Sequence, residues 1–123
     1  ADITPVSDVQ TLVEMQRQVI EIHVEPTLQK YILEIVGLSR ADNRLVLGVS
    51  PRGSLALYRG AQAMAAIRGR DYVVPEDIKD IAVPVLRKRI LLKSEHSARG
   101  LGEVDVVKQM LEKVAVPGLK EAV

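Results

Sequence analysis

The sequence predicts a mainly α-helical bundle with two very short strands. Apolar residues recur at helical spacing through most of the chain, and prolines stand where three helices would begin, at Pro26, Pro51 and Pro75. Hydrophobic residues make up 47% of the 123 residues, but aromatic residues only 2%, so the core must be aliphatic. This length fits one domain or a piece of a longer protein.

The first predicted helix begins after Ser7, which can cap it. Its apolar residues fall on one face that we expect to be buried: Val9, Leu12, Val13, Val19 and Ile20. Apolar residues two apart then predict a very short strand over residues 22–24.

The second helix begins at Pro26, where the missing N–H costs nothing. Its predicted buried face consists of Leu28, Tyr31, Ile32, Ile35 and Val36. The polar residues 39–47 (SRADNRLVL) predict a loop.

Ser50 and Pro51 form an N-cap followed by proline, which predicts a sharp start for the third helix. Its predicted buried side consists of Leu57, Tyr58, Ala61, Met64 and Ala65, and Gly69 is a plausible C-terminal stop. Residues 72–74 are the second strand, which we expect to pair in parallel with residues 22–24.

Pro75 opens the fourth helix, and Glu76 and Asp77 are interpreted as charges that favour its N-terminus rather than as a catalytic acid/base pair. Its expected apolar face consists of Ile78, Ile81, Ala82 and Val85. Pro84 is expected to kink or restart this helix near its end.

After the fourth helix, residues 87–93 are compatible with a helix end or an extended stretch, and residues 94–102 predict a loop. A last helix is predicted from the spacing of Val104, Val107, Leu111 and Val114. Residues 118–123 are expected to form a frayed tail.

Composition excludes several classes of function. The chain has 17 Lys and Arg against 16 Asp and Glu, too balanced for a dedicated nucleic-acid binder. It has no cysteine, which excludes disulfides and agrees with a cytoplasmic location. No apolar run approaches a membrane span. His23 and His96 lack partners at metal-ligand spacing, so no metal site is predicted.

Catalytic residues are not predicted in this chain. Gly48 and Gly53 match the glycine spacing of a phosphate-binding loop, but Ser54 and Leu55 follow where Lys and Ser or Thr are required. Without that lysine the contact with the β- and γ-phosphates is missing, so we expect no ATP hydrolysis by this chain alone.

Arg52 contradicts a local rule. With Ser50 as the N-cap, Arg52 is the second helical residue, and a cation there is unfavourable by about 0.3–1 kcal/mol. An anion bound by the guanidinium and the helix N-terminus would remove that cost. The alternative is an exposed arginine without a ligand, or one paired with an acid elsewhere.

Four sequence blocks together resemble the C-terminal lid domain of MoxR-family AAA+ ATPases. They are residues 48–54 (GVSPRGS), 69–73 (GRDYV), 75–78 (PEDI) and 85–89 (VLRKR). The resemblance extends over roughly residues 7–117, so the whole chain, residues 1–123, is predicted to be one such lid without its core ATPase domain. Two positions depart from the family pattern: Val74 stands where threonine is usual, and Lys88 where histidine is expected.

The resemblance implies that Arg52 is the sensor-2 arginine, which reaches the phosphates of ATP, and that Ser50 and Pro51 position it. It further implies ATP and Mg²⁺ as cofactors of the longer parent, none for the isolated fragment, and a homo-oligomeric ring, which is often a hexamer in the family. The implied role is chaperone-like maturation of partner proteins, von Willebrand factor A domain proteins among them, with no membrane partner.

The predicted function is therefore that of a lid that closes over ATP held by a preceding core domain. Two alternatives remain. The first is a nucleic-acid-binding helical module that uses the basic residues Arg87, Lys88, Arg89 and Lys93. The second is a structural interaction domain without a ligand.

Overall fold

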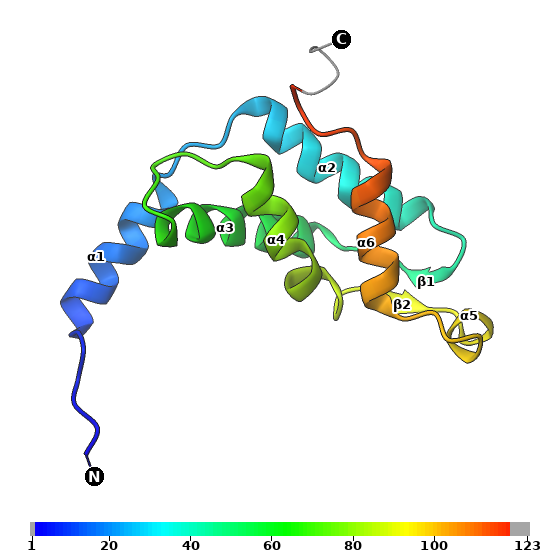
Figure 1. The fold of residues 1–123 in the computed structure, drawn as a ribbon, viewed down its shortest axis with the longest axis horizontal. Coiled ribbons are helices and arrows are strands. Elements are labelled where there is room, and N and C mark those ends of the chain that lie inside the picture. Colours follow the sequence, from blue (N-terminus) through cyan, green and yellow to red (C-terminus); the bar gives the residue numbers. More distant parts are fainter. Residues whose placement is uncertain (1, 119–123) are drawn as a thin grey trace.

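The computed structural model describes residues 2–118, which form a helical bundle with a small sheet at one end (Figure 1). The helices and strands are, in chain order, α1 (Val9–Ile20), α2 (Pro26–Ala41), β1 (Leu45–Leu47), α3 (Pro51–Ile67), α4 (Pro75–Leu86), β2 (Leu91–Leu92), α5 (Ser94–Ala98) and α6 (Glu103–Lys113). The predicted tail, residues 118–123, lies outside the described residues except for Gly118.

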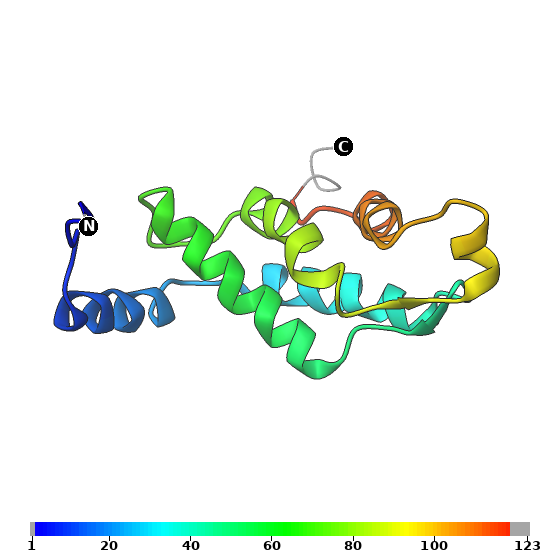
Figure 2. The ribbon, with the colours of Figure 1, turned by 90° about the horizontal axis from the view of Figure 1, so that it is seen from below.

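The core is mainly aliphatic, in line with the prediction, but also contains Tyr31, and it lies where α2, α3, α4 and α6 meet. Figure 2 shows α3 crossing α2 obliquely, with α4 and α6 on the other side of the core. All five predicted residues of α2 are buried. In the later helices, residues at the centre of each predicted face are buried, namely Leu57, Ala61, Ala65, Ile78, Ala82 and Val107. Residues at the edges of those faces, such as Tyr58 and Ile81, are half-buried.

Proline fixes three helix starts as predicted, because Pro26, Pro51 and Pro75 are each the first residue of a helix. The stop at Gly69 is also confirmed. Gly69 has φ +75°, and its N–H donates to Ala66 O while the N–H of Arg70 donates to Ala65 O. This pair of bonds is the Schellman arrangement that ends many helices.

The predicted parallel pairing of residues 22–24 with 72–74 is confirmed as a single bridge between His23 and Tyr72. The N–H of His23 donates to Asp71 O at 3.0 Å, and the N–H of Val73 donates to His23 O at 2.9 Å. Gln62 lies beneath this bridge, and its buried amide donates to Ile22 O at 2.8 Å. The bridge therefore joins the start of α2 to the start of α4.

The prediction of a loop over residues 39–47 was wrong in part. Helix α2 continues to Ala41, and β1 pairs in antiparallel register with β2, with Leu45 opposite Leu92 and Leu47 opposite Leu91. The N–H of Lys93 donates to Arg44 O just beyond the ladder. Residues 87–93 thus include an extended stretch. Residues 94–102 were predicted to be a loop but contain α5, and Pro84 lies inside α4 without restarting it.

The expected burial of α1 was wrong. The helix forms, but its N-cap is Asp8, whose carboxylate accepts from Thr11 N at 2.7 Å, rather than Ser7. Helix α1 has no buried residue, and Val9, Leu12, Val13 and Ile20 are all exposed. Figure 1 shows why: α1 extends away from the bundle at one end of α3.

We expect Leu12→Ala to change the free energy of unfolding of this chain by less than about 0.5 kcal/mol. Leu12 is half-exposed on a helix without buried residues, so the substitution creates no cavity. Leu28→Ala is the matched control, because Leu28 is buried in α2 and its loss should cost several times more. Urea unfolding of both variants measures this, and equal destabilisation would show that α1 packs against the bundle.

Candidate functional site

The segment that leads into α3 lies directly on the end of α2. A Cβ atom added to Gly48 would lie 2.7 Å from Ser39 O and 2.9 Å from the Cα of Arg40. Real Cβ atoms do not approach backbone this closely, so only glycine allows this contact. The contact fixes the path of the chain three residues before α3 begins.

Two side chains of α2 then hold the next residue, Val49. The N–H of Val49 donates to the Ser39 hydroxyl at 2.9 Å, and that buried hydroxyl donates to Val36 O at 2.6 Å. The guanidinium of Arg40 donates to Val49 O at 2.9 Å. Both backbone groups of Val49 are therefore satisfied by α2, and the chain enters α3 at a defined point.

The predicted N-terminus of α3 is confirmed in its geometry. Ser50 is the N-cap, and its hydroxyl accepts from Gly53 N at 3.4 Å, which is long for such a bond. Pro51 is the first helical residue, so Arg52 is the second and projects from the first turn. Its side chain is exposed.

The charge around Arg52 is positive without compensation. Among the described helices, α3 alone has no acidic residue at its N-cap or in its first turn; the others have Asp8, Glu25, Glu76, Glu95 or Glu103 there. In the part of the chain that the structure describes, Arg52 forms no ion pair or side-chain hydrogen bond. The guanidinium of Arg52 is thus available to an anion, together with its own backbone N–H, whereas Pro51 has no N–H and those of Gly53 and Ser54 donate to Ser50.

Packing explains the two glycines that resemble a phosphate-binding loop. Gly48 is required by α2, as described above. Gly53 is buried in the first turn of α3, and a Cβ there would clash with Cγ1 of Val49. The spacing of these glycines therefore comes from close contacts within the fold, in agreement with the exclusion of a phosphate-binding loop on sequence grounds.

A buried ion-pair cluster lies at the opposite end of α3. The carboxylate of Asp77 accepts from Arg70 at 2.6 and 2.7 Å, from Arg68 at 3.0 Å and from the N–H of Val74 at 2.8 Å. Asp77 is fully buried, and Arg68 also donates to Asp80 at 2.6 Å. Asp77 is a capping residue, as predicted, but its role in this cluster was not foreseen.

The cluster keeps Asp77 ionised. Burial alone would raise the pKa of Asp77, but the hydrogen bonds from Arg70, from the backbone of Val74 and from Arg68 outweigh it and hold the pKa below its usual value of 3.8. The same carboxylate accepts from the backbone N–H of Val74, as the third helical residue does in a capping box, while the valine side chain has no oxygen for the reciprocal bond. The cluster joins the end of α3 to the start of α4 and is structural.

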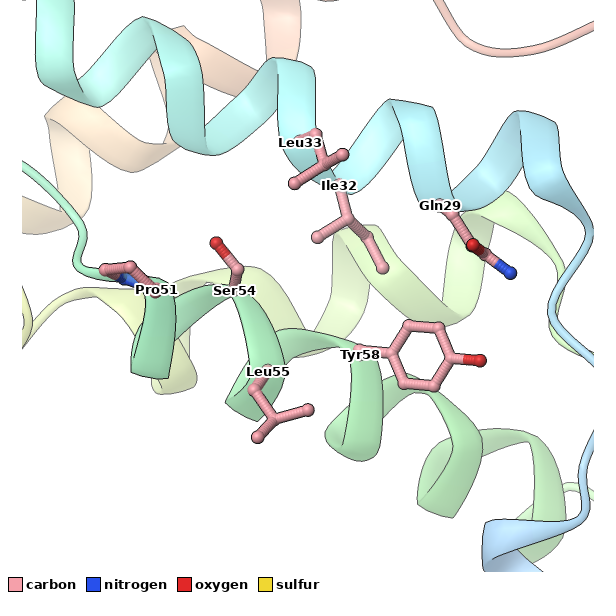
Figure 3. A pocket seen from close by; sticks show the side chains of 7 residues that line it. All are labelled: Gln29, Ile32, Leu33, Pro51, Ser54, Leu55 and Tyr58. Carbon is pink, nitrogen blue, oxygen red and sulfur yellow. The ribbon is translucent and has the colours of Figure 1, made fainter.

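A shallow groove of about 410 Å³ lies between α2 and α3 beside the first turn of α3 (Figure 3). It is lined by Gln29, Ile32, Leu33, Pro51, Ser54, Leu55 and Tyr58. Leu33 and Leu55 are exposed, and no charged residue lines the groove. It therefore suits an apolar surface, whereas the charge chemistry of this end of α3 belongs to Arg52.

Other kinds of site are not found in the described residues. There, no three histidine and acidic side chains gather where they could hold a metal ion. None of the helices between residues 2 and 118 is both long and apolar enough to span a membrane.

Comparison with known proteins shows the family to which this fold belongs. A family model described as the AAA lid domain matches residues 38–116. A Bacillus subtilis protein named only as uncharacterized protein YeaC is 36% identical over 98% of this chain and 38% of its own. Chaperone MoxR1 of Mycobacterium tuberculosis is 34% identical over 68% of this chain and 22% of its own.

A solved structure shows the same architecture. The crystal structure of a candidate ATPase from Cytophaga hutchinsonii superposes with a TM-score of 0.83 and 33% identity, over 87% of this chain and 35% of that one. The fold is thus that of the small helical domain of an AAA+ protein, and the chain belongs to the AAA lid domain family. It spans well under half the length of these relatives.

Proposed function

We propose that this domain closes over ATP bound by the core ATPase domain of a longer, MoxR-like parent, and that Arg52 contacts the phosphates. The observation that carries the proposal is the arrangement at the start of α3. Arg52 is exposed on a first turn that begins at Ser50 and Pro51 and whose backbone path is fixed by Gly48, Ser39 and Arg40. A side chain without a partner on a rigid base suits recognition of an external group.

The donor chemistry fits a polyphosphate. A guanidinium presents a planar set of N–H donors that matches phosphate oxygens, and the N–H groups of the first turn add partial positive charge beside it. ATP with Mg²⁺ would supply the phosphoryl group that is transferred. This chain would bind and orient the terminal phosphates and exclude water from one side, while the nucleophile and the metal ligands belong to the core domain.

The wider role follows from the resemblance and from the names of the relatives. We infer a parent that forms a homo-oligomeric ring, a hexamer in the simplest case, in the cytoplasm. The name chaperone MoxR1 and the resemblance to that family support a chaperone-like role in maturing partner proteins, of which proteins with von Willebrand factor A domains are candidates.

In the full-length parent, Arg52→Ala is expected to weaken ATP binding or turnover by about 10- to 100-fold. A charge-assisted hydrogen bond contributes about 1.5–3 kcal/mol, and its loss gives this factor. Arg52→Lys should restore only part of the loss, because an ammonium group cannot reproduce the planar fork. Nucleotide titration and steady-state hydrolysis measure the two effects.

Arg59→Ala is the matched control for Arg52. Arg59 is an exposed arginine two turns further along α3, and it donates to Gln62 at 3.2 Å. Its replacement should leave nucleotide binding unchanged. The isolated domain should melt at the same temperature with Arg52→Ala, or slightly higher, because the cation no longer faces the helix dipole. If ATP affinity and turnover stayed within twofold of the wild type, the assignment of Arg52 would be wrong, and the lid function would rest on the resemblance alone.

A further inference from the structure

A second arginine, Arg89, reaches the first turn of α3 from another part of the chain. It follows the end of α4, and its N–H donates to Leu86 O at 2.8 Å. A Cβ atom on Gly53 would lie only 3.4 Å from Cδ of Arg89. The aliphatic part of Arg89 therefore passes over Gly53, which is the residue directly after Arg52, and its guanidinium begins at the next atom.

Within residues 2–118, Arg89 resembles Arg52 in having no acidic partner. Its guanidinium forms no ion pair or hydrogen bond there, and its side chain is exposed. Three other arginines differ from Arg52 and Arg89, because each pairs with a carboxylate. Arg44 pairs with Asp42 at 2.7 Å, and Arg68 and Arg70 pair with Asp77. The fold thus supplies carboxylates to those three arginines, whereas the two beside the start of α3 have none in the described contacts, as is also true of Arg59, Arg87 and Arg99.

The remaining residues of the basic cluster lie elsewhere. Arg87 and Lys88 line a hollow against the start of α6, together with Gly102, Glu103 and Val104. The N–H of Lys93 donates to Arg44 O beside the β1–β2 ladder. Of the four basic residues between 87 and 93, only Arg89 has its side chain placed against Gly53 in the described contacts.

We propose that Arg89 is a second phosphate-binding residue, which acts with Arg52 on the same nucleotide phosphates. Two guanidiniums beside one helix N-terminus repel each other, and a polyanion between them removes that cost. AMP has one phosphate group, whereas ATP has three, so two arginines should discriminate between them. The inference rests on the proposed function, since it places Arg89 at the site defined by Arg52.

The test uses the full-length parent and isothermal titration with Mg-ATP and with AMP. Arg89→Met keeps the aliphatic stem over Gly53 and removes the charge. It is expected to weaken ATP binding about 10-fold and AMP binding less than twofold, and Arg89→Lys should recover part of the ATP affinity. Lys88→Met is the matched control from the neighbouring position and should bind ATP as the wild type does. Thermal melts of all variants should agree within a degree or two.

The possible outcomes separate the two proposals. If Arg52→Ala weakens ATP binding and Arg89→Met does not, the role of Arg89 is overturned and the lid function stands. If neither variant weakens binding, both are overturned. If Arg89→Met and Lys88→Met weaken binding equally, the effect is one of net charge and Arg89 has no special role. The double variant should lose less ATP affinity than the product of the fold-losses of the two single variants, because both arginines act on one ligand.

Discussion

Replacing Asp77 with asparagine is expected to lower the free energy of unfolding of this domain by about 3 kcal/mol. Asparagine keeps the size of the side chain but removes the charge that Arg68 and Arg70 share, and it turns an amide N–H₂ toward their donors. Breaking a buried ion pair costs about 3–5 kcal/mol. The low end applies because both arginines keep some contact with water. Urea unfolding measures the change.

Asp80→Asn is the matched control for Asp77. Its carboxylate pairs with Arg68 at 2.6 Å, but half of the side chain is exposed, so its loss should cost less than about 1 kcal/mol. An equal loss of unfolding free energy in Asp77→Asn and Asp80→Asn would contradict the conclusion that the buried carboxylate of Asp77 holds α3 to α4.

The advantage of Asp77 over asparagine should depend on pH. The folded pKa of Asp77 lies below its usual value of 3.8, so its contribution to stability is complete above that value and is lost as the pH falls through the folded pKa. The difference in unfolding free energy between the wild type and Asp77→Asn should therefore be constant from pH 7 to about 5 and shrink below about pH 4. A constant difference down to pH 2 would contradict this.

Gly48→Ala is expected to destabilise the domain by about 3 kcal/mol, the upper end of the usual cost of an added methyl in a packed site. The new Cβ would lie 2.7 Å from Ser39 O, and backbone atoms cannot move aside as a flexible side chain can. Its φ is not positive, so the cost comes from this contact alone. Urea unfolding of the isolated domain again gives the value.

Gly37→Ala is the control for Gly48. Gly37 lies inside α2, and an added Cβ there would meet no atom within 4 Å. Alanine in an open helical position should stabilise the domain by about 0.5–1 kcal/mol. If the free energy of unfolding falls for Gly48→Ala and rises for Gly37→Ala, the contact with α2, and not the loss of a glycine as such, determines the effect. The same sign at both positions would contradict the model of the α2–α3 junction.

Helix starts could be predicted from the sequence because proline acts locally. Pro26, Pro51 and Pro75 each fix one backbone angle and lack one donor, so their preferred position does not depend on the rest of the fold. The strands β1 and β2 were missed because two or three residues have no periodicity to detect. Their pairing joins residues almost fifty positions apart, which local patterns do not report.

Periodicity also says nothing about what covers an apolar face. The spacing of the apolar residues in α1 correctly predicted a helix, yet that apolar face is not buried in the described residues. For the candidate site, the cap and the position of Arg52 followed from Ser50 and Pro51. The support from Ser39 and Arg40, and the approach of Arg89, could not be predicted, because each is a tertiary contact.

Helix α3 is held at both of its ends. Asp77 holds the end at Arg68, and Ser39 and Arg40 of α2 hold the segment that leads into the end at Arg52. Arg52 can therefore change its position only when the domain rotates as one body. The 17 residues of α3 span about 25 Å at 1.5 Å per residue. A rotation of the whole domain by about 10° around the end at Arg68 would displace Arg52 by about 4 Å, more than the length of a hydrogen bond.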